Sequence, residues 1–255
     1  LTEIGNDYAV FLQHVIWMGA TFCTTNPVLI KLAWDTDPEY WNNRADQIID
    51  KAIPDAGTLL SAGTEQLKDA VFEINSKLTM AVVLENCKLL RDIFLVTEGQ
   101  QGYVSLQVNP EVHEDADLMV SEASKLYEEL DEELGGVPNV VFKLPSTAPG
   151  LEAAAALTSA GIGVTITLTF SVFQSMGFAE VLQRGDQLVS YIAIMNGRMA
   201  YPVRDEIGVL DVDGGIEAAR WAGVAVARKA NRALYSEGSG LNVDAKRVRI
   251  MIASL

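Results

Sequence analysis

The sequence contains few of the residues that bind metals or form disulfides. It has two cysteines, Cys23 and Cys87, and two histidines, His14 and His113, in 255 residues. Two cysteines make no disulfide framework, which favours a reducing compartment, so we predict a cytoplasmic location. Neither histidine has a second His, Cys or acidic residue at ligand spacing, so we expect no bound metal.

Basic residues are also scarce, with 19 Lys and Arg against 34 Asp and Glu and a net charge of −15. Nucleic acids and anionic membranes are bound through clustered basic side chains, so we expect neither partner. The most apolar stretch, from Gly161 to Phe178, is interrupted too often by hydroxyl and amide side chains to span a membrane. Any anionic substrate must therefore be held by a few well-placed basic residues.

Strand and helix patterns alternate along the whole chain. The seven predicted strands are Leu1–Asp7, Thr21–Asn26, Tyr103–Asn109, Asn139–Pro145, Gly163–Phe170, Leu188–Arg198 and Arg247–Leu255. The predicted helices are Tyr8–Met18, Asp37–Ala52, Thr64–Val96, Asp115–Leu134, Gly150–Ala160, Ser171–Arg184 and Gly214–Tyr235. This alternation predicts an α/β fold with a parallel sheet. The length suits one (β/α)₈ TIM barrel of ~250 residues, and an open doubly wound sheet is the alternative.

One lysine, Lys143, interrupts the apolar run of the fourth predicted strand. A lysine removed from water loses solvation energy or its proton, so lysines are rare inside core strands. It is either a strand-end lysine that reaches solvent, or a desolvated lysine whose lowered pKa makes it a nucleophile for a carbonyl carbon.

Neighbouring strands favour the nucleophile. Gln107, Thr165 and Thr167 lie on the polar sides of otherwise apolar strands. Polar side chains that point inward near the carboxyl ends of separate strands form the active sites of barrel enzymes. These groups would suit a polyhydroxylated substrate, and they favour a closed barrel over an open sheet.

With these residues in place, the sequence resembles the transaldolase family along nearly its whole length. The matching segments are Thr24-Thr25-Asn26-Pro27, Val104-Ser105-Leu106-Gln107-Val108, Phe142-Lys143-Leu144-Pro145-Ser146-Thr147 with Gly150-Leu151 and Ala153-Ala154, Thr167-Leu168-Thr169-Phe170-Ser171 with Gln174, and Gly197-Arg198. The order of the segments and the interval between the lysine and the Thr-Leu-Thr-Phe-Ser stretch make the match specific.

The resemblance implies a single (β/α)₈ barrel over residues 1–255 that needs no cofactor. Lys143 would form a Schiff base with a ketose phosphate, and a dihydroxyacetone unit would pass to an aldose phosphate. Asp7 would take the sugar hydroxyl proton, and Gln107 and Thr167 would hold a catalytic water. The substrate-binding residues implied are Thr25, Asn26, Thr165, Ser171 and Arg198, the last for the phosphate.

Each role has a structural alternative. Asp7 could cap the first helix, and Asn26 before a proline could serve a turn. Arg198 could pair with a surface carboxylate. The threonines could be present because β-branched residues favour strands.

Several positions depart from the family pattern and leave the substrates open. Gln107 stands where many transaldolases have glutamate, and Thr165 replaces an asparagine. Ala193 and Met195 replace a serine and an aromatic residue before the Gly-Arg pair. We therefore carry three functions: a transaldolase, an aldolase that acts on fructose 6-phosphate or a sulfosugar, and a barrel that binds sugar phosphates without turnover. A homo-oligomer is left open.

The last predicted strand resembles the seventh strand of the family. In the family, a second phosphate-binding arginine and an eighth strand follow this segment. A barrel open between its first and seventh strands would expose two unpaired edges. We therefore expect the natural protein to continue beyond Leu255.

Overall fold

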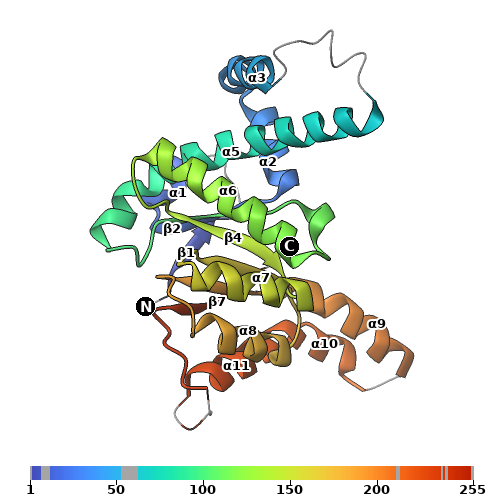
Figure 1. The fold of residues 1–255 in the computed structure, drawn as a ribbon. Helices are drawn as coiled ribbons and strands as arrows, with labels where there is room; N and C mark the ends of the chain where they lie inside the picture. The colour runs from blue at the N-terminus through green and yellow to red at the C-terminus, as the bar shows by residue number, and fades with distance from the viewer. Residues whose placement is uncertain are drawn as a thin grey trace. The chain divides into compact units, whose positions relative to one another are not determined.

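A computed structural model describes residues 2–6, 12–52, 63–210, 213–236, 238 and 241–253. The chain divides into two compact units. The first comprises Leu1–Leu106 and Glu128–Val140, and the second comprises Gln107–Tyr127 and Val141–Leu255. Figure 1 shows the strands and helices of both, and each unit is described by itself.

The first unit begins with three parallel strands and the helices between them. Its elements are β1 (Ile4–Asn6), α1 (Leu12–Trp17), β2 (Ala20–Thr24), α2 (Pro27–Thr36), α3 (Pro38–Ala52), α5 (Thr64–Val96) and β3 (Tyr103–Gln107). β2 pairs with β1 on one side and with β3 on the other. The predicted bounds of α5 are confirmed, and α3 begins at the predicted proline. α2 was not predicted.

Local signals explain where α2 and α3 begin. The Asn26 side chain accepts a hydrogen bond from Leu29 N at 2.9 Å, and Pro27 occupies the first turn of α2. The Asp37 side chain likewise accepts from Tyr40 N at 3.2 Å. Both are an N-cap residue followed by proline, an arrangement that satisfies a free backbone N–H and presets the helical φ.

The buried Asn139 joins α5 to the strands of the first unit. Its side-chain nitrogen donates to Cys87 O at 3.0 Å and to Gly102 O at 2.7 Å. Its backbone oxygen accepts from Val104 N at 3.0 Å. Burial raises the pKa of the neighbouring Cys87 thiol, which stays protonated. Because its side-chain amide and its backbone oxygen have partners, Asn139 can lie in an apolar core at little desolvation cost.

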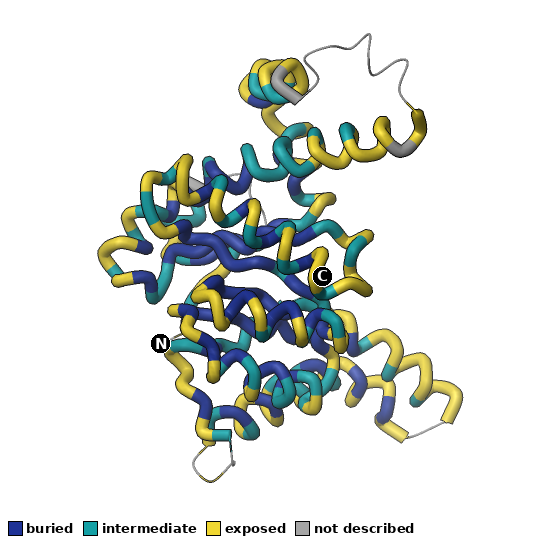
Figure 2. The backbone as a smooth tube through the Cα atoms, viewed as in Figure 1, coloured by how far each residue is buried: buried dark blue, intermediate teal, exposed yellow. Residues whose placement is uncertain are grey.

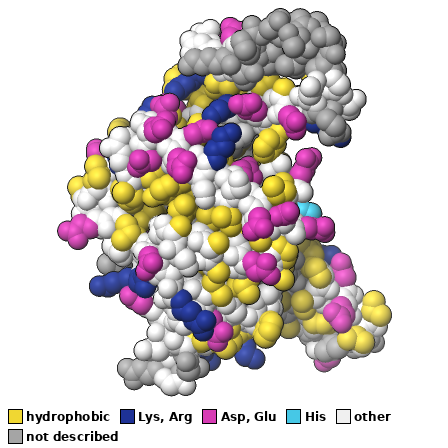
Figure 3. Space-filling model, in the orientation of Figure 1, with side chains coloured by type: hydrophobic (Ala, Val, Ile, Leu, Met, Phe, Trp, Pro, Cys, Tyr) yellow, Lys and Arg dark blue, Asp and Glu magenta, His cyan; other side chains and the backbone are white. Residues whose placement is uncertain are grey.

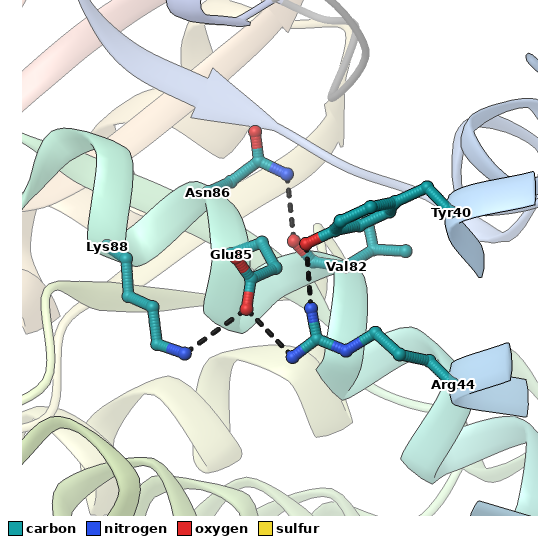
Figure 4. A network of polar contacts seen from close by, with 6 residues as sticks. All are labelled: Tyr40, Arg44, Val82, Glu85, Asn86 and Lys88. Carbon is teal, nitrogen blue, oxygen red and sulfur yellow. Dashed lines mark hydrogen bonds and ion pairs between the residues drawn. The ribbon is translucent and has the colours of Figure 1, made fainter. Parts of the chain in front are cut away.

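A polar network joins α3 to α5 (Figure 4). Arg44 of α3 donates to the Tyr40 hydroxyl at 2.9 Å and pairs with the Glu85 carboxylate at 2.8 Å. Lys88 reaches the same carboxylate at 3.1 Å. Burial alone would raise the pKa of Glu85, but the hydrogen bonds and charges of Arg44 and Lys88 outweigh burial and lower it. The network thus favours the ionised carboxylate.

The second unit contains four parallel strands in chain order. Its elements, with the helix that joins the units, are η1 (Pro110–Val112), α6 (Ala116–Leu134), β4 (Val140–Pro145), α7 (Ala148–Ser159), β5 (Val164–Thr169), α8 (Val172–Leu182), β6 (Ser190–Met195), η2 (Gly197–Met199), α9 (Ala200–Leu210), α10 (Gly215–Ala219), α11 (Ala222–Tyr235) and β7 (Val248–Ala253). The pairs β4–β5, β5–β6 and β6–β7 are all parallel. The residues of β4, β5 and β6 are mostly buried, whereas those of β7 are mostly intermediate (Figure 2).

One predicted helix is wrong in the second unit, and one was missed. The segment Gly214–Tyr235 forms two helices, because Arg220 N and Trp221 N bond three residues back and end α10. The chain then turns so that Gly223 lies against Asn196, where an added Cβ would be 2.1 Å from Asn196 O. α9 was not predicted because it has no buried face.

The α/β class is confirmed. Within each unit, parallel strands follow in chain order with helices between them, which is the arrangement of a (β/α) barrel. The described ranges contain seven strands, so the eighth strand of a closed barrel is not among them.

Tyr235, at the end of α11, covers part of one edge of β7. Ser190 N of β6 donates to Arg247 O, so the backbone groups of Val248 and Ile250 face the opposite edge. There the Tyr235 hydroxyl donates to Val248 O at 2.9 Å and accepts from Ile250 N at 3.0 Å. Burial raises the pKa of Tyr235 to about 12, so the hydroxyl keeps its proton.

Candidate active site

Lys143 lies within the buried strand β4 of the second unit. Phe142 and Leu144 on either side of it are completely buried, whereas Lys143 itself is half-buried. In the register of the sheet, Lys143 pairs with Thr165 of β5, and Pro145 pairs with Thr167. Residues paired in a parallel sheet project to the same face. Lys143 and Thr165 therefore share one face, as the polar faces of the strands predicted.

Thr165 supplies a buried hydroxyl beside the lysine. Its side chain is fully buried, and its Oγ1 has no hydrogen-bond partner among the described residues. An unpaired hydroxyl in an apolar interior is costly, so such groups usually bind an ordered water or a ligand. This hydroxyl is thus a candidate contact for a molecule that reaches Lys143.

A β-bulge places Thr167 at the carboxyl end of β5. Ile166 pairs with Ile192 and Thr169 with Ile194, so Thr167 and Leu168 together oppose one residue of β6. Leu168 has a φ of 60°, which a leucine rarely adopts, and its side chain is 47% exposed. The Thr167 hydroxyl lies 3.9 Å from Met195 Sδ. Bulges redirect side chains near active sites, and no residue type in the sequence indicated this one.

Ser171 is the N-cap of α8, and Gln174 completes a capping box with it. Gln174 N donates to Ser171 Oγ at 3.1 Å, while Gln174 Oε1 accepts from Ser171 N at 3.1 Å and from Phe170 N at 2.9 Å. Gln174 Nε2 also donates to Ser146 O at 3.1 Å, just after β4. The structure thus gives Ser171 a capping role, and Gln174 a bridging role that the sequence did not reveal.

Thr25 and Asn26 lie in the first unit, at the carboxyl end of β2. The Thr25 hydroxyl donates to Ser105 O at 2.7 Å. The Asn26 oxygen caps α2, a helix that was not predicted, whereas its structural alternative had been a turn. That cap uses only the oxygen of the amide, and its nitrogen has no partner among the described residues. A substrate contact through this nitrogen stays a prediction.

Three further predicted site residues have different surroundings. Gln107 is the last residue of β3 and is half-buried. Arg198 lies in η2 just after β6, where its side chain is exposed and forms no ion pair with the described residues. Asp7 lies outside the described residues, so its catalytic and capping alternatives both stay predictions.

Glu122 of α6 supports the chain just beyond Gln107. Its carboxylate accepts a hydrogen bond from Asn109 N at 2.9 Å. Asn109 in turn caps η1 by accepting from Glu111 N at 3.0 Å. Burial raises the pKa of the Glu122 carboxyl, and the hydrogen bond from Asn109 only partly opposes burial. Glu122 is one of many acidic residues in this helix, and nothing in the sequence pattern distinguished it as partly buried.

Replacing Glu122 with glutamine should raise the melting temperature at pH 7 but not at pH 4. The folded pKa of Glu122 lies above its ordinary 4.5, so the folded state holds a proton that the unfolded state releases. The free energy of unfolding therefore falls as the pH rises from about 4.5 through the folded pKa. Glutamine keeps an acceptor for Asn109 without this penalty. Melting curves of both proteins at the two pH values test this, and a difference that does not change with pH would contradict it.

The charges on the surface are mainly negative, as Figure 3 shows for one face. In the part of the chain that the structure describes, no three His, Cys, Asp or Glu residues gather to hold a metal ion. Nor does any helix among the described residues have the length and apolar character to cross a bilayer.

The carboxyl ends of β4, β5 and β6 bring polar groups to one edge of the sheet. Ser146 directly follows β4, and Ser171 and Arg198 come shortly after the ends of β5 and β6. Lys143 and Thr165 lie deeper on the same strands. The Lys143 amine, within an apolar strand, can attack a carbonyl carbon, and the Thr165 hydroxyl beside it can bind a substrate hydroxyl. The Arg198 cation, beyond the end of β6, can bind an anion.

Comparison with known proteins gives a consistent result. A family model described as transaldolase/fructose-6-phosphate aldolase matches residues 11–255. A transaldolase of Kocuria rhizophila is 32% identical over 162 residues, which are 64% of this chain and 38% of that protein. A transaldolase of Thiobacillus denitrificans is 30% identical over 167 residues, 66% of this chain and 40% of that protein. The aligned part of the chain thus spans about two fifths of the length of these curated relatives.

Proposed function

Because the chain belongs to the transaldolase/fructose-6-phosphate aldolase family, we propose that it transfers a dihydroxyacetone unit between sugar phosphates through a Schiff base on Lys143. The observation that supports this most directly is the position of Lys143. It lies in a buried strand, in register with an unpaired buried hydroxyl on Thr165. A strand-end lysine that reaches solvent would have no need of such a neighbour.

In the proposed reaction, the neutral amine of Lys143 attacks the ketose carbonyl, and water leaves to give an iminium ion. Asp7 takes the proton of the C4 hydroxyl. The electrons of the C3–C4 bond move into the iminium, which becomes an enamine, and an aldose leaves. The enamine then attacks an incoming aldose carbonyl, and Asp7 returns the proton to the new hydroxyl. Water releases the product ketose from Lys143.

The remaining residues of the site have supporting roles in this proposal. Gln107 and Thr167 hold the water that enters and leaves at the lysine. Thr25, Asn26, Thr165 and Ser171 contact sugar hydroxyls, and Arg198 binds the phosphate. The thiols of Cys23 and Cys87 are buried and are not joined in a disulfide, which suits a cytoplasmic location.

A second function is an aldolase of the same family that releases dihydroxyacetone to water. Gln107 favours it, because glutamine in place of glutamate at this position resembles the fructose 6-phosphate aldolase branch. Both functions use the same lysine and differ in the acceptor.

Two measurements test these functions. The protein is incubated with fructose 6-phosphate and borohydride, and the modified lysine is mapped by mass spectrometry. We expect the adduct on Lys143, and its absence from every lysine would overturn the mechanism. The protein is then supplied with fructose 6-phosphate alone or together with an aldose phosphate. Product that needs the aldose indicates a transaldolase, whereas free dihydroxyacetone without it indicates the aldolase.

Replacing Arg198 with lysine should raise the Michaelis constant for fructose 6-phosphate about tenfold, the equivalent of one lost hydrogen bond between charged groups. Arginine binds phosphate through two parallel N–H groups, and lysine cannot reproduce this geometry. Turnover should change much less, because the reacting carbons lie away from the phosphate. Unphosphorylated fructose is the control, and its Michaelis constant should not change. An equal rise for both sugars would contradict a phosphate site at Arg198.

A further inference from the structure

Gln174 joins three segments at the carboxyl edge of the second unit's sheet. Its Oε1 accepts from the backbone of Phe170 and Ser171, at the end of β5 and the start of α8. Its Nε2 donates to Ser146 O, directly after the lysine strand β4. Capping alone requires only the acceptor. The Nε2 donor of Gln174 is not needed for capping, and it holds the end of β4 through Ser146 O.

The groups that Gln174 holds adjoin two residues of the proposed site. Ser146 lies three residues after Lys143, and Ser146 N donates to Thr167 O at 2.8 Å. Ser146 O thus accepts a hydrogen bond from Gln174, and Ser146 N donates one to the bulge residue Thr167. Beyond the ladder that pairs β4 with β5, two hydrogen bonds therefore hold the end of β4, and Gln174 makes one of them.

The bulge needs this support because Leu168 is in an unfavourable conformation. A left-handed backbone at a leucine is strained and persists only where the surroundings impose it. Leu168 is 47% exposed, so packing of its side chain does little to impose it. The backbone bonds on either side do so, from Ser146 N to Thr167 O and from Phe170 N to Gln174 Oε1.

We propose that Gln174 is a positioning residue, which holds the β5 bulge and the end of β4 so that Thr167 is correctly placed relative to Lys143. This inference rests on the proposed function. Loss of the glutamine would let Leu168 relax toward an ordinary conformation and move Thr167 with it. A displacement of about 1 Å at a catalytic group can cost on the order of 10²-fold in rate.

Two variants separate capping from positioning. Gln174→Met removes both halves of the amide, whereas Gln174→Glu keeps the capping acceptor but has no donor for Ser146 O. With fructose 6-phosphate as donor and a four-carbon aldose phosphate as acceptor, we expect both variants to lose about 10²-fold in kcat with little change in KM, while borohydride still traps the ketose on Lys143. The matched controls are Gln66→Met and Gln66→Glu, because Gln66 Oε1 accepts a hydrogen bond from Gly63 N at 3.3 Å at the start of α5 in the first unit. They should keep the parental kcat.

A rescue variant tests the path through the bulge. Glycine adopts a positive φ without strain, so Leu168→Gly should allow the bulge to form without the hydrogen bonds of Gln174. Adding it to Gln174→Met should recover about tenfold of the lost kcat, a partial return toward the parental geometry. No recovery would overturn the role of the bulge.

The proposal is overturned if Gln174→Glu melts at a lower temperature but keeps the parental kcat, since capping would then explain the residue. Equal losses of kcat in the Gln66 controls would also overturn it. If the parent itself forms no adduct on Lys143 and no product, the proposed function fails first. An active parent with fully active Gln174 variants means that only the positioning role is wrong.

Discussion

Replacement of Lys143 with methionine is expected to abolish the borohydride adduct and to lower turnover by at least roughly 10⁴-fold. Methionine keeps a long unbranched side chain in the apolar strand but has no amine. Without the amine no covalent intermediate forms, and Asp7 then has no iminium ion to receive the electrons of the breaking bond. Binding of the sugar phosphate should persist, because Arg198 and the hydroxyl groups remain.

The matched control is Lys229→Met, which removes an exposed lysine from α11. It should keep both the adduct and the turnover of the parent. Trapping is measured by intact mass after borohydride reduction, and no separate binding measurement is needed. An adduct of parental yield on the Lys143→Met protein would show that another amine is the nucleophile.

Replacement of Gly150 with alanine should lower the free energy of unfolding by about 3 kcal/mol. Gly150 lies in the first turn of α7, which follows the lysine strand. An added Cβ there would lie 2.0 Å from Pro145 O and 3.3 Å from Thr147 Oγ1. Pro145 O is a backbone atom and cannot rotate away, so the helix or the end of β4 has to move. The melting temperature should fall by roughly 6–12 °C.

Gly177→Ala is the control for this change. Gly177 is also in a helix, α8, but a Cβ added there meets no atom within 4 Å. Alanine favours helices over glycine, so this variant should gain about 0.5–1 kcal/mol. Thermal unfolding of both variants gives the comparison. If Gly150→Ala were as stable as the parent, α7 would not pack as closely on the end of β4 as the structure indicates.

Much of the fold could be predicted because its signals are local. The cap and proline at Asp37 and Pro38 mark the start of α3, and the apolar period of Thr64–Val96 defines α5. The lysine was recognised as unusual for the same reason, since one charge in an apolar strand conflicts with its neighbours. The register that pairs Lys143 with Thr165 then confirmed that the two share a face.

The features that were missed depend on contacts distant in the sequence. The bulge at Thr167 and Leu168 appears only when β5 is aligned with β6, and leucine gives no sign of a positive φ. The bond from Gln174 to Ser146 joins residues 28 positions apart. The break between α10 and α11 occurs where Gly223 meets the backbone of Asn196. No periodicity or capping pattern encodes such contacts.

The Tyr235 hydroxyl restricts how a further strand could be added to β7. A peptide that pairs with this edge needs a donor for Val248 O and an acceptor for Ile250 N, and Tyr235 already supplies both. An added strand must therefore displace the tyrosine or begin its ladder beyond Ile250, toward Ala253. The first half of the edge is closed to self-association, and an incoming strand has a narrow choice of register. One side chain thus acts as a stop that sets where strand addition can begin.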